Sequence, residues 1–382
     1  MLKKLPVILI LVIILSILFN SIIPLMFKQI IFACSLTIKS IVLFLLPFVI
    51  FGLLFKTFVK LADNALSVIV LIFGGLCLSN LINTFLTHYV GSLFYQFDLN
   101  IGHVIKNTDQ LAPYFSLQLP QIIKNDYALF GGIICGVLTF IYSKDIAVKL
   151  AHRIDIYVKK MFSFISLLIP LFIVGFVIKC ASEDILLSLI QSYSVVLAIF
   201  LVYASLYTFL YYFVINKCVF EHTIACIKNM MPALVTALSS ISSVITMPIT
   251  ILSTEKNVKN KDLAASTISA TVNIHLLGDC LAIPLLAYAL LKHYGIAEPA
   301  LRAYFIFTVF FVIAKFSVAA VPAGGIIIMT PILEKYLGFT PEMSSLIIAI
   351  YVIFDPFVTG FNVLGNGAFA KLVDQLYYKI KR

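Results

Sequence analysis

Long apolar runs alternate with short polar segments along most of this chain. Because a membrane-spanning helix needs roughly 20 apolar residues, the pattern predicts about eight membrane passages. Some shorter apolar segments do not reach this length. The runs cover residues 5–27, 41–58, 65–94, 128–142, 161–178, 185–214, 263–291, 303–321 and 344–358.

In the C-terminal half, two apolar segments are interrupted by clusters of small, polar and helix-breaking residues. The clusters are SSISSVITMP at 239–248 and VPAGG at 321–325, and each leaves two halves that are too short to span. Irregular backbone at membrane depth is tolerated only where protein or a water-filled cavity covers it. We therefore interpret both segments as re-entrant hairpins that enter from opposite faces, which predicts a binding site at the midplane between them.

A polar stripe lies in the last apolar segment, which reads FDPFVTGFNVLGN from 354 to 366. Its members share one helical face because they are spaced at i, i+4, i+7 and i+11. Each polar group is costly in lipid unless it has a partner or a wet cavity. The stripe therefore predicts a functional site, with a structurally paired acid as the alternative. Its members are Asp355, Thr359, Asn362 and Asn366.

Composition supports a polytopic membrane protein, since 62% of the residues are hydrophobic, 12% are charged and the mean hydropathy is +1.09. The net charge of +10 does not indicate a nucleic-acid partner, because the basic residues gather at the ends of alternate runs instead of in one patch. By the positive-inside rule they mark the cytoplasmic side, and both termini fall on it. Seven scattered cysteines without a CxxC pair predict neither a disulfide nor a metal site.

Four motifs in the C-terminal half occur in a characteristic order. They are SSVITMPIT (242–250), NIHLL (273–277), AKFSVAAVPAGG (314–325) and DPFVTGFNVLGN (355–366). In order and spacing they resemble the motifs of the dicarboxylate/amino acid:cation symporter family, which includes bacterial glutamate, aspartate, C4-dicarboxylate and serine/threonine transporters. The first 220 residues match that family only in helix count and in fragments such as PFVIFGLL.

The resemblance implies an all-α polytopic membrane protein with eight transmembrane helices and two re-entrant helical hairpins, the elevator fold of glutamate-transporter homologues. It also implies a homotrimer in the lipid bilayer of a bacterial inner membrane, with cytoplasmic termini and no cofactor. Residues 1–220 would serve mainly as scaffold and trimerisation surface, although helices near 66–94 and 185–215 join the transport core at 221–382. Within the core we expect hairpins at about 226–253 and 314–337, and helices at about 262–292 and 343–376.

By the same resemblance, Asp355 binds the ammonium group of a substrate and Asn362 binds its α-carboxylate, with Thr359 beside them. A zwitterion in a cavity of low dielectric constant needs an acid at one end and amide donors at the other. Further substrate contacts are expected at the two hairpin tips. They come from Ser242 and Ser243 at the first tip and from Val321 and Gly325 at the second.

Two differences from the family change the expected substrate. Val358 stands where members with acidic substrates carry an arginine, and Leu277 replaces a threonine that assists it. A second carboxylate would lack its bidentate partner, so we expect a small neutral amino acid or a related organic acid. Lys315 could instead meet a second carboxylate from another direction, which keeps a glutamate/aspartate or C4-dicarboxylate symporter as the alternative.

Cation or proton coupling is expected at a second group of residues. Two of them, His275 and Asn366, stand where family members have the acids of sodium sites. Amide and imidazole groups are poor sodium ligands, whereas histidine titrates near neutral pH, so protons are preferred over sodium ions. The spacing of His275 and Asp279 at i and i+4 lets them face each other on a helix. Alternatively, Asp279 replaces the family's acid, or His275 is a core histidine in a protein that has lost coupling. The coupling group comprises Asn273, His275, Asp279 and Asn366.

The sequence therefore predicts a secondary active symporter that is coupled to H⁺ or Na⁺. An uncoupled facilitator or channel on the same scaffold is an alternative, because two cation-site acids are missing. An enzyme is disfavoured, since HExxH and GxSxG are absent and the six histidines are dispersed. A non-transporting helical scaffold would leave the polar stripe around Asp355 without an explanation.

Overall fold

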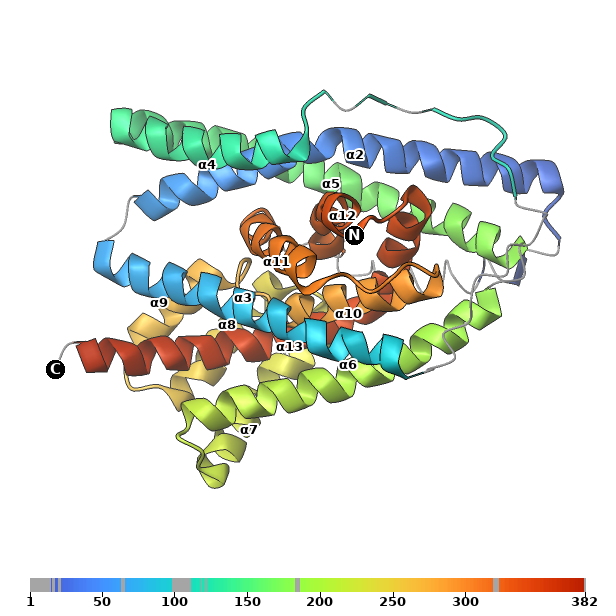
Figure 1. The fold of residues 1–382 in the computed structure, drawn as a ribbon. Coiled ribbons are helices and arrows are strands. Elements are labelled where there is room, and N and C mark those ends of the chain that lie inside the picture. Colours follow the sequence, from blue (N-terminus) through green and yellow to red (C-terminus); the bar gives the residue numbers. More distant parts are fainter. Residues whose placement is uncertain are drawn as a thin grey trace.

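The computed structural model describes residues 22–62, 66–97, 111–117, 119–120, 122–182, 186–318 and 323–380, together with residues 15, 18 and 19. Within these ranges the chain forms α-helices joined by short connections and contains no strand (Figure 1). The all-α fold class expected from the sequence is confirmed for this part of the chain. The first expected passage, 5–27, lies largely outside the described residues, and Val321 lies outside them as well.

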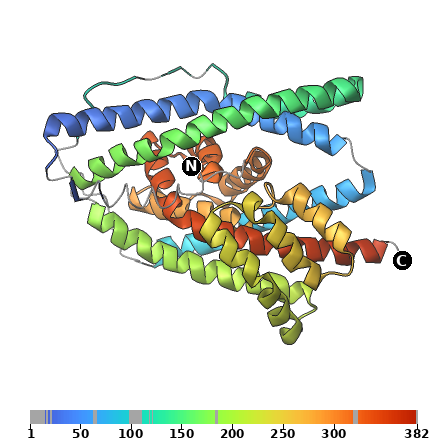
Figure 2. The ribbon, with the colours of Figure 1, turned by 180° about the vertical axis from the view of Figure 1, so that it is seen from behind.

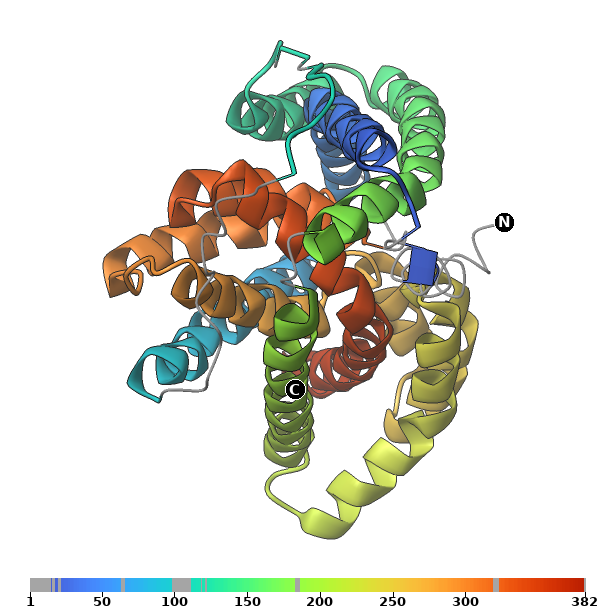
Figure 3. The same ribbon diagram turned by 90° about the vertical axis from the view of Figure 1, so that its right-hand side faces the viewer.

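Three N-terminal helices form one group. They are α2 (Leu25–Ala62), α4 (Asn125–Tyr142) and α5 (Lys144–Ser182), and α2 packs along both of the others. Figure 3, which looks along the helices, shows this group on one side of the molecule, next to the remaining helices. The helix α2 is continuous through residues 28–40, where the apolar pattern had left a gap between two runs.

The centre of the molecule is α10 (Leu277–His293), in which every residue except Lys292 is buried. A helix that is apolar on all sides is stable only when other elements surround it. Here α3 (Leu66–Gln96), α6 (Leu186–Ile215) and α13 (Pro341–Ile380) provide that surrounding layer. Figure 2 shows the long α13 running through the core towards the C-terminus.

Two pairs of helices pack against this centre. In the first pair, α7 (Phe220–Ser240) and α8 (Ser243–Thr254) are joined by only two residues, and Ile241 takes the left-handed conformation that turns the chain. In the second pair, α11 (Leu301–Lys315) packs on α12 (Gly324–Leu337), and Ala323 is left-handed at the start of α12. The pairs begin at Phe220 and Leu301, which is earlier than the expected hairpin starts at 226 and 314.

The expected helix at 262–292 is two helices. After the short 3₁₀ segment η2 (Glu255–Asn257), α9 (Lys261–Thr271) ends before the NIHLL motif and α10 begins at its last residue. Residues 272–276 between them are not helical. By contrast, the expected helix at 343–376 is one unbroken helix, α13, although Pro356 lies within it.

By length and composition, three helices among the described residues can cross a membrane. These segments are Leu25–Val59, Gln191–Ile215 and Pro341–Lys379. The 15-residue α11 begins two residues before the apolar run 303–321, which the pattern predicts as a passage, and covers most of that run. At 1.5 Å per residue it is about 22 Å long, which is shorter than a bilayer core of about 30 Å. It is therefore one arm of a helix pair.

Candidate functional site

A small cavity lies where the two helix pairs, the break before α10 and the middle of α13 meet. Its volume of about 30 Å³ accommodates a water molecule and is far smaller than an amino acid. A larger ligand can therefore enter only if one of the surrounding segments moves. The cavity is lined by Ile241, Ser242, Ser243, Val272, Asn273, Leu276, Asp279, Val318, Gly325, Tyr351, Asp355, Thr359 and Asn362.

Most residues that the sequence proposed for the site are brought together here. All the described candidates for substrate binding line the cavity except Val358, which is fully buried elsewhere in the packing of α13. Of the coupling candidates, Asn273 and Asp279 line it, whereas His275 and Asn366 are buried outside it. All four motifs therefore contribute residues to the cavity, but the coupling candidates do not form one cluster.

Asp355 connects α13 to the tip of the second helix pair. Its Oδ2 accepts a hydrogen bond of 2.8 Å from the backbone N–H of Ala323, and its Oδ1 lies 3.5 Å from the hydroxyl of Thr359. The left-handed conformation of Ala323 (φ 58°) turns this N–H towards the carboxylate. The same acid that is expected to bind an ammonium group therefore holds the tip in place in this conformation.

Asn362 is oriented by a backbone group. Its Oδ1 accepts a hydrogen bond of 3.3 Å from the backbone N–H of Asp279. The amide NH₂ is then the part of the side chain that can donate to a ligand. One turn later, Asn366 donates to the carbonyl of Asn362 at 2.9 Å, and its own Oδ1 is 3.3 Å from the hydroxyl of Thr271. Asn366 therefore joins α13 to α9 and does not face the cavity.

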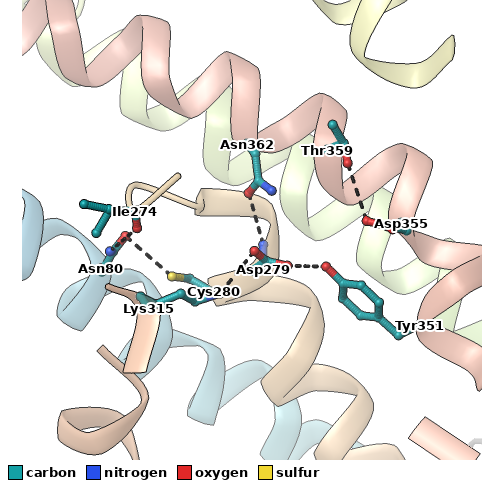
Figure 4. Close-up of polar contacts among 9 residues, drawn as sticks. All are labelled: Asn80, Ile274, Asp279, Cys280, Lys315, Tyr351, Asp355, Thr359 and Asn362. Atoms are coloured by element: carbon teal, nitrogen blue, oxygen red, sulfur yellow. Dashed lines mark hydrogen bonds and ion pairs between the residues drawn. The ribbon is translucent and has the colours of Figure 1, made fainter. Parts of the chain in front are cut away.

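Asp279 forms an ion pair with Lys315 from α11, with 3.2 Å between Oδ2 and Nζ. The hydroxyl of Tyr351 donates a hydrogen bond to the other carboxylate oxygen. Figure 4 shows Lys315 and Tyr351 approaching Asp279 from opposite sides. The Lys315 side chain is completely buried, and its ammonium group also lies 4.6 Å from the centre of the Phe311 ring. This arrangement balances a buried negative charge with a buried positive charge.

This ion pair was not predicted from the sequence, where Lys315 is only a possible partner for a substrate carboxylate and Tyr351 is not a candidate. Both carried a signal: Lys315 is a cation inside an apolar run, and Tyr351 lies one turn before Asp355 on the polar face of α13.

His275 does not line the cavity and instead contacts α3 and α13. Its Nε2 is 3.0 Å from the hydroxyl of Ser79, and its ring stacks on Phe369 with 4.6 Å between the ring centres. The expected contact between His275 and Asp279 is not formed, because the chain from 272 to 276 is not helical and the i, i+4 rule does not apply. His275 is completely buried among these neighbours.

Polar side chains on α3 stabilise the break. The amide of Asn80 donates 2.9 Å to the carbonyl of Ile274, a group that has no helical partner in this segment (Figure 4). Asn83 accepts a hydrogen bond from Tyr207 of α6. The Asn80 contact satisfies irregular backbone inside an apolar core, and the Asn83 contact joins α3 to α6. Their sequence signal is the polar stripe Ser79, Asn80, Asn83 and Thr87 within the run 65–94.

The model of the sodium:dicarboxylate symporter family matches residues 5–376. The chain belongs to this family. Comparison with curated proteins gave no match. As a member of the sodium:dicarboxylate symporter family, the protein is a membrane transporter and not an enzyme, and it moves a small molecule together with a cation. The match extends over the N-terminal helices, in which the sequence alone showed only weak resemblance.

Within a symporter of this family, the cavity has the chemistry for a small charged molecule. One wall provides a carboxylate, Asp355, and the amide donor of Asn362. The first tip also lines the cavity, and there Ser242 caps the N-terminus of α8 by accepting from the N–H of Ile245 at 3.4 Å. A helix N-terminus favours an anionic group. The cavity can therefore hold both a cationic and an anionic group.

Proposed function

We propose that this symporter carries a small neutral amino acid and that protons, in preference to sodium ions, drive its transport. The observation that carries this proposal is the unequal pairing of the two cavity carboxylates. Asp279 is paired with Lys315, whereas Asp355 has no ion-pair partner among the described residues. A buried, unpaired carboxylate favours a ligand that brings one positive charge. The ammonium group of an amino acid meets that requirement.

The remaining polar groups favour one carboxylate on the ligand. The NH₂ group of Asn362 and the first tip at Ser242 and Ser243 can bind it. A substrate with two carboxylates would need a further cation, and Lys315 is already paired. The other lining groups include Ile241, Leu276 and Val318, which suit a small side chain of low polarity. These apolar groups discriminate against a long acidic side chain.

Proton coupling is supported by the surroundings of the two neutral residues at the expected cation-site positions. Asn366 uses its amide oxygen within the packing of α9 and α13, and His275 lies between Ser79 and Phe369. Neither provides the carboxylate ligand that a hard cation prefers. A glutamate/aspartate or C4-dicarboxylate substrate is the second candidate, favoured by the buried ammonium of Lys315. An uncoupled facilitator or channel is the third, favoured by the absence of a charge at both positions.

The architecture that we propose is the elevator fold with eight transmembrane helices and two re-entrant hairpins. The helix pairs α7–α8 and α11–α12 are the hairpins, and the group of α2, α4 and α5 is the scaffold. Residues 1–220 then serve mainly as scaffold, with α3 and α6 joining the transport core at 221–382. We further propose a homotrimer in a bacterial inner membrane with cytoplasmic termini, as the distribution of basic residues suggests.

Uptake into proteoliposomes tests this proposal. A panel of labelled neutral amino acids, aspartate, glutamate and C4-dicarboxylates is offered under an imposed proton gradient and, separately, under a sodium gradient. Accumulation of a neutral amino acid with the proton gradient alone is the expected result. Sodium-driven accumulation of aspartate or a dicarboxylate would contradict both the substrate and the coupling ion. Equilibration without accumulation would indicate a facilitator or channel.

A further inference from the structure

The ion pair between Asp279 and Lys315 is isolated from bulk water. The side chain of Lys315 is 0% exposed and that of Asp279 is 3% exposed, and Nζ lies 3.2 Å from Oδ2. The other carboxylate oxygen accepts the hydrogen bond from Tyr351, so both oxygens are engaged. An isolated carboxylate in such a place is strongly unfavourable, and removal of its partner leaves an uncompensated charge.

The fold positions each charge at the helix end that favours it. Asp279 lies in the first turn of α10, where the helix dipole stabilises a negative group. Lys315 is the last residue of α11, where the dipole stabilises a positive group. The ammonium also faces the Phe311 ring at 4.6 Å. One feature therefore stabilises the charge of Asp279, and two stabilise the charge of Lys315.

The pair also lies directly behind the second tip. A Cβ atom added to Gly325 would come within 2.9 Å of Oδ1 of Asp279, so the tip backbone touches the carboxylate. Asp279 lines the cavity itself, whereas Lys315 approaches it from behind. The carboxylate thus belongs to the wall that a substrate meets, and the charge on that wall depends on Lys315.

We propose that Lys315 is a built-in counter-cation, which neutralises Asp279 during transport in place of a mobile sodium ion or proton. This inference rests on the proposed function and deepens it, because it names the group that makes one coupling ion unnecessary. A carboxylate beside the substrate must be neutralised before the loaded site can be enclosed in an apolar environment. A covalently attached ammonium does this without binding an ion from solution. The remaining coupling ion then serves Asp355 and the substrate.

Removal of the ammonium creates a new requirement for a cation. In the Lys315→Met variant, Asp279 has no cation, so we expect initial uptake to fall at least about tenfold at neutral pH. Lowering the pH or adding sodium should restore much of that uptake, because a proton or sodium ion can then neutralise Asp279. The double variant Asp279→Asn, Lys315→Met removes both charges. It should transport better than Lys315→Met at neutral pH and show no new cation dependence.

A control is Lys292→Met, which removes a partly buried lysine at the end of α10. Lys292 donates to the carbonyls of Phe94 and Phe97 and has no acid partner in the part of the chain that the structure describes. This variant should lose some stability but keep the parental dependence on pH and sodium. The comparison separates loss of a specific counter-cation from loss of any buried lysine.

Thermal melting of detergent-purified protein provides a readout that needs no substrate. The melting temperature of Lys315→Met should rise relative to the parent as the pH falls, because protonation removes the unpaired charge. The double variant should follow the parent. The other titratable groups near the pair are present in all of these variants. They are Tyr351 and Asp355 on α13 and Cys280 on α10, with Tyr203 and Tyr207 of α6 beyond Cys280.

Either of two results would overturn the inference. One is a Lys315→Met protein with parental uptake and parental dependence on cations. The other is a double variant that melts and transports no better than Lys315→Met. If the parent instead carries a dicarboxylate with sodium, the proposed function fails. The comparison of the parent, Lys315→Met and the double variant still tests the role of Lys315. If Lys315→Met does not fold at neutral pH, recovery of folding in the double variant is the expected result, and its failure contradicts the proposal.

Discussion

At the scale of single residues, two of the cavity side chains form contacts that hold the fold and also carry a group that can bind a ligand. Asn362 uses its amide oxygen to hold the N–H of Asp279 and leaves its NH₂ group for a ligand. Asp355 accepts from Ala323 and Thr359 and is also the acid without an ion-pair partner in the described structure. Ligand binding at Asp355 must therefore compete with a contact that holds the second tip. This links occupancy of the site to the position of α12.

Replacement of Asp355 by asparagine tests the ammonium site. The side chain keeps its size but loses its charge, so we expect substrate uptake to fall about 100-fold or more, since the ammonium would lie in the cavity without a counter-charge. Uptake per folded molecule in proteoliposomes measures the effect. Asp374→Asn is the control on the same helix, because Asp374 binds the N–H groups of Lys259 and Asn260 far from the cavity. Retained transport in Asp355→Asn would exclude the proposed ammonium role.

Replacement of Asn362 by aspartate tests the carboxylate site. The new side chain keeps an oxygen for the N–H of Asp279 but replaces the NH₂ donor with a second acceptor. We expect KM for the amino acid to rise about 10-fold to 100-fold, because a negative group then faces the substrate carboxylate. The uptake rate as a function of substrate concentration gives KM. An unchanged KM would mean that the carboxylate binds elsewhere, for example only at the first tip.

The site residues show why some could be predicted from the sequence and others could not. Asp355, Thr359 and Asn362 form a periodic polar stripe on one continuous helix, so local spacing is enough to place them together. The partner of Asp279 comes from α11, and only the folded chain brings Lys315 next to it. His275 was paired with Asp279 on the assumption of a helix, and the break at 272–276 removed that geometry.

At the scale of elements, interruption of helices shapes the site. The break between α9 and α10 exposes backbone groups, and Asn80 of α3 satisfies one of them. The polar clusters lie between α7 and α8, between α9 and α10 and at the start of α12, because such clusters interrupt an apolar period. The bounds were less accurate: the expected start of the second hairpin at 314 is the end of α11, since nothing in a uniformly apolar run tells a passage from a hairpin arm.

Close packing of α10 on α13 gives a prediction for Gly278. A Cβ atom at this position would lie 2.1 Å from the backbone carbonyl oxygen of Val358, and neither backbone can yield without moving its helix. We expect Gly278→Ala to lower the free energy of unfolding by about 2–3 kcal/mol, despite the better helix propensity of alanine. The midpoint of thermal unfolding in detergent measures the change.

Gly74 provides the matched comparison for that substitution. It lies exposed in α3, and a Cβ atom there would meet nothing within 4 Å. Gly74→Ala should therefore be neutral or stabilising by up to about 1 kcal/mol. Equal effects of the two substitutions would show that the contact between Gly278 and Val358 is not tight in the membrane protein.

At the scale of the whole molecule, the structure divides into the group of α2, α4 and α5 and the core around α10. The apolar pattern alone does not indicate this division, which was expected only from the family resemblance that assigned the helices near 66–94 and 185–215 to the core. The contacts between the groups are therefore the informative ones. One of them is polar: the ammonium of Lys39 on α2 donates to the carbonyl of Pro341 and, at 2.9 Å, to the hydroxyl of Ser345, both at the start of α13.

If the core moves relative to α2 during transport, the contact at Lys39 must break, so it should stabilise the conformation described here. We expect Lys39→Met to increase hydrogen exchange several-fold at the first turns of α13, because both bonds are lost. Ser345→Ala should have a smaller effect, since the carbonyl of Pro341 remains, and the double variant should resemble Lys39→Met.

Lys56→Met is the control, because Lys56 pairs with Asp155 inside the α2 and α5 group. Mass-spectrometric hydrogen exchange reads each helix separately. Equal protection of α13 in all four variants would mean that apolar packing alone holds the two groups together, and that the polar contact at Lys39 does not bias the position of the core.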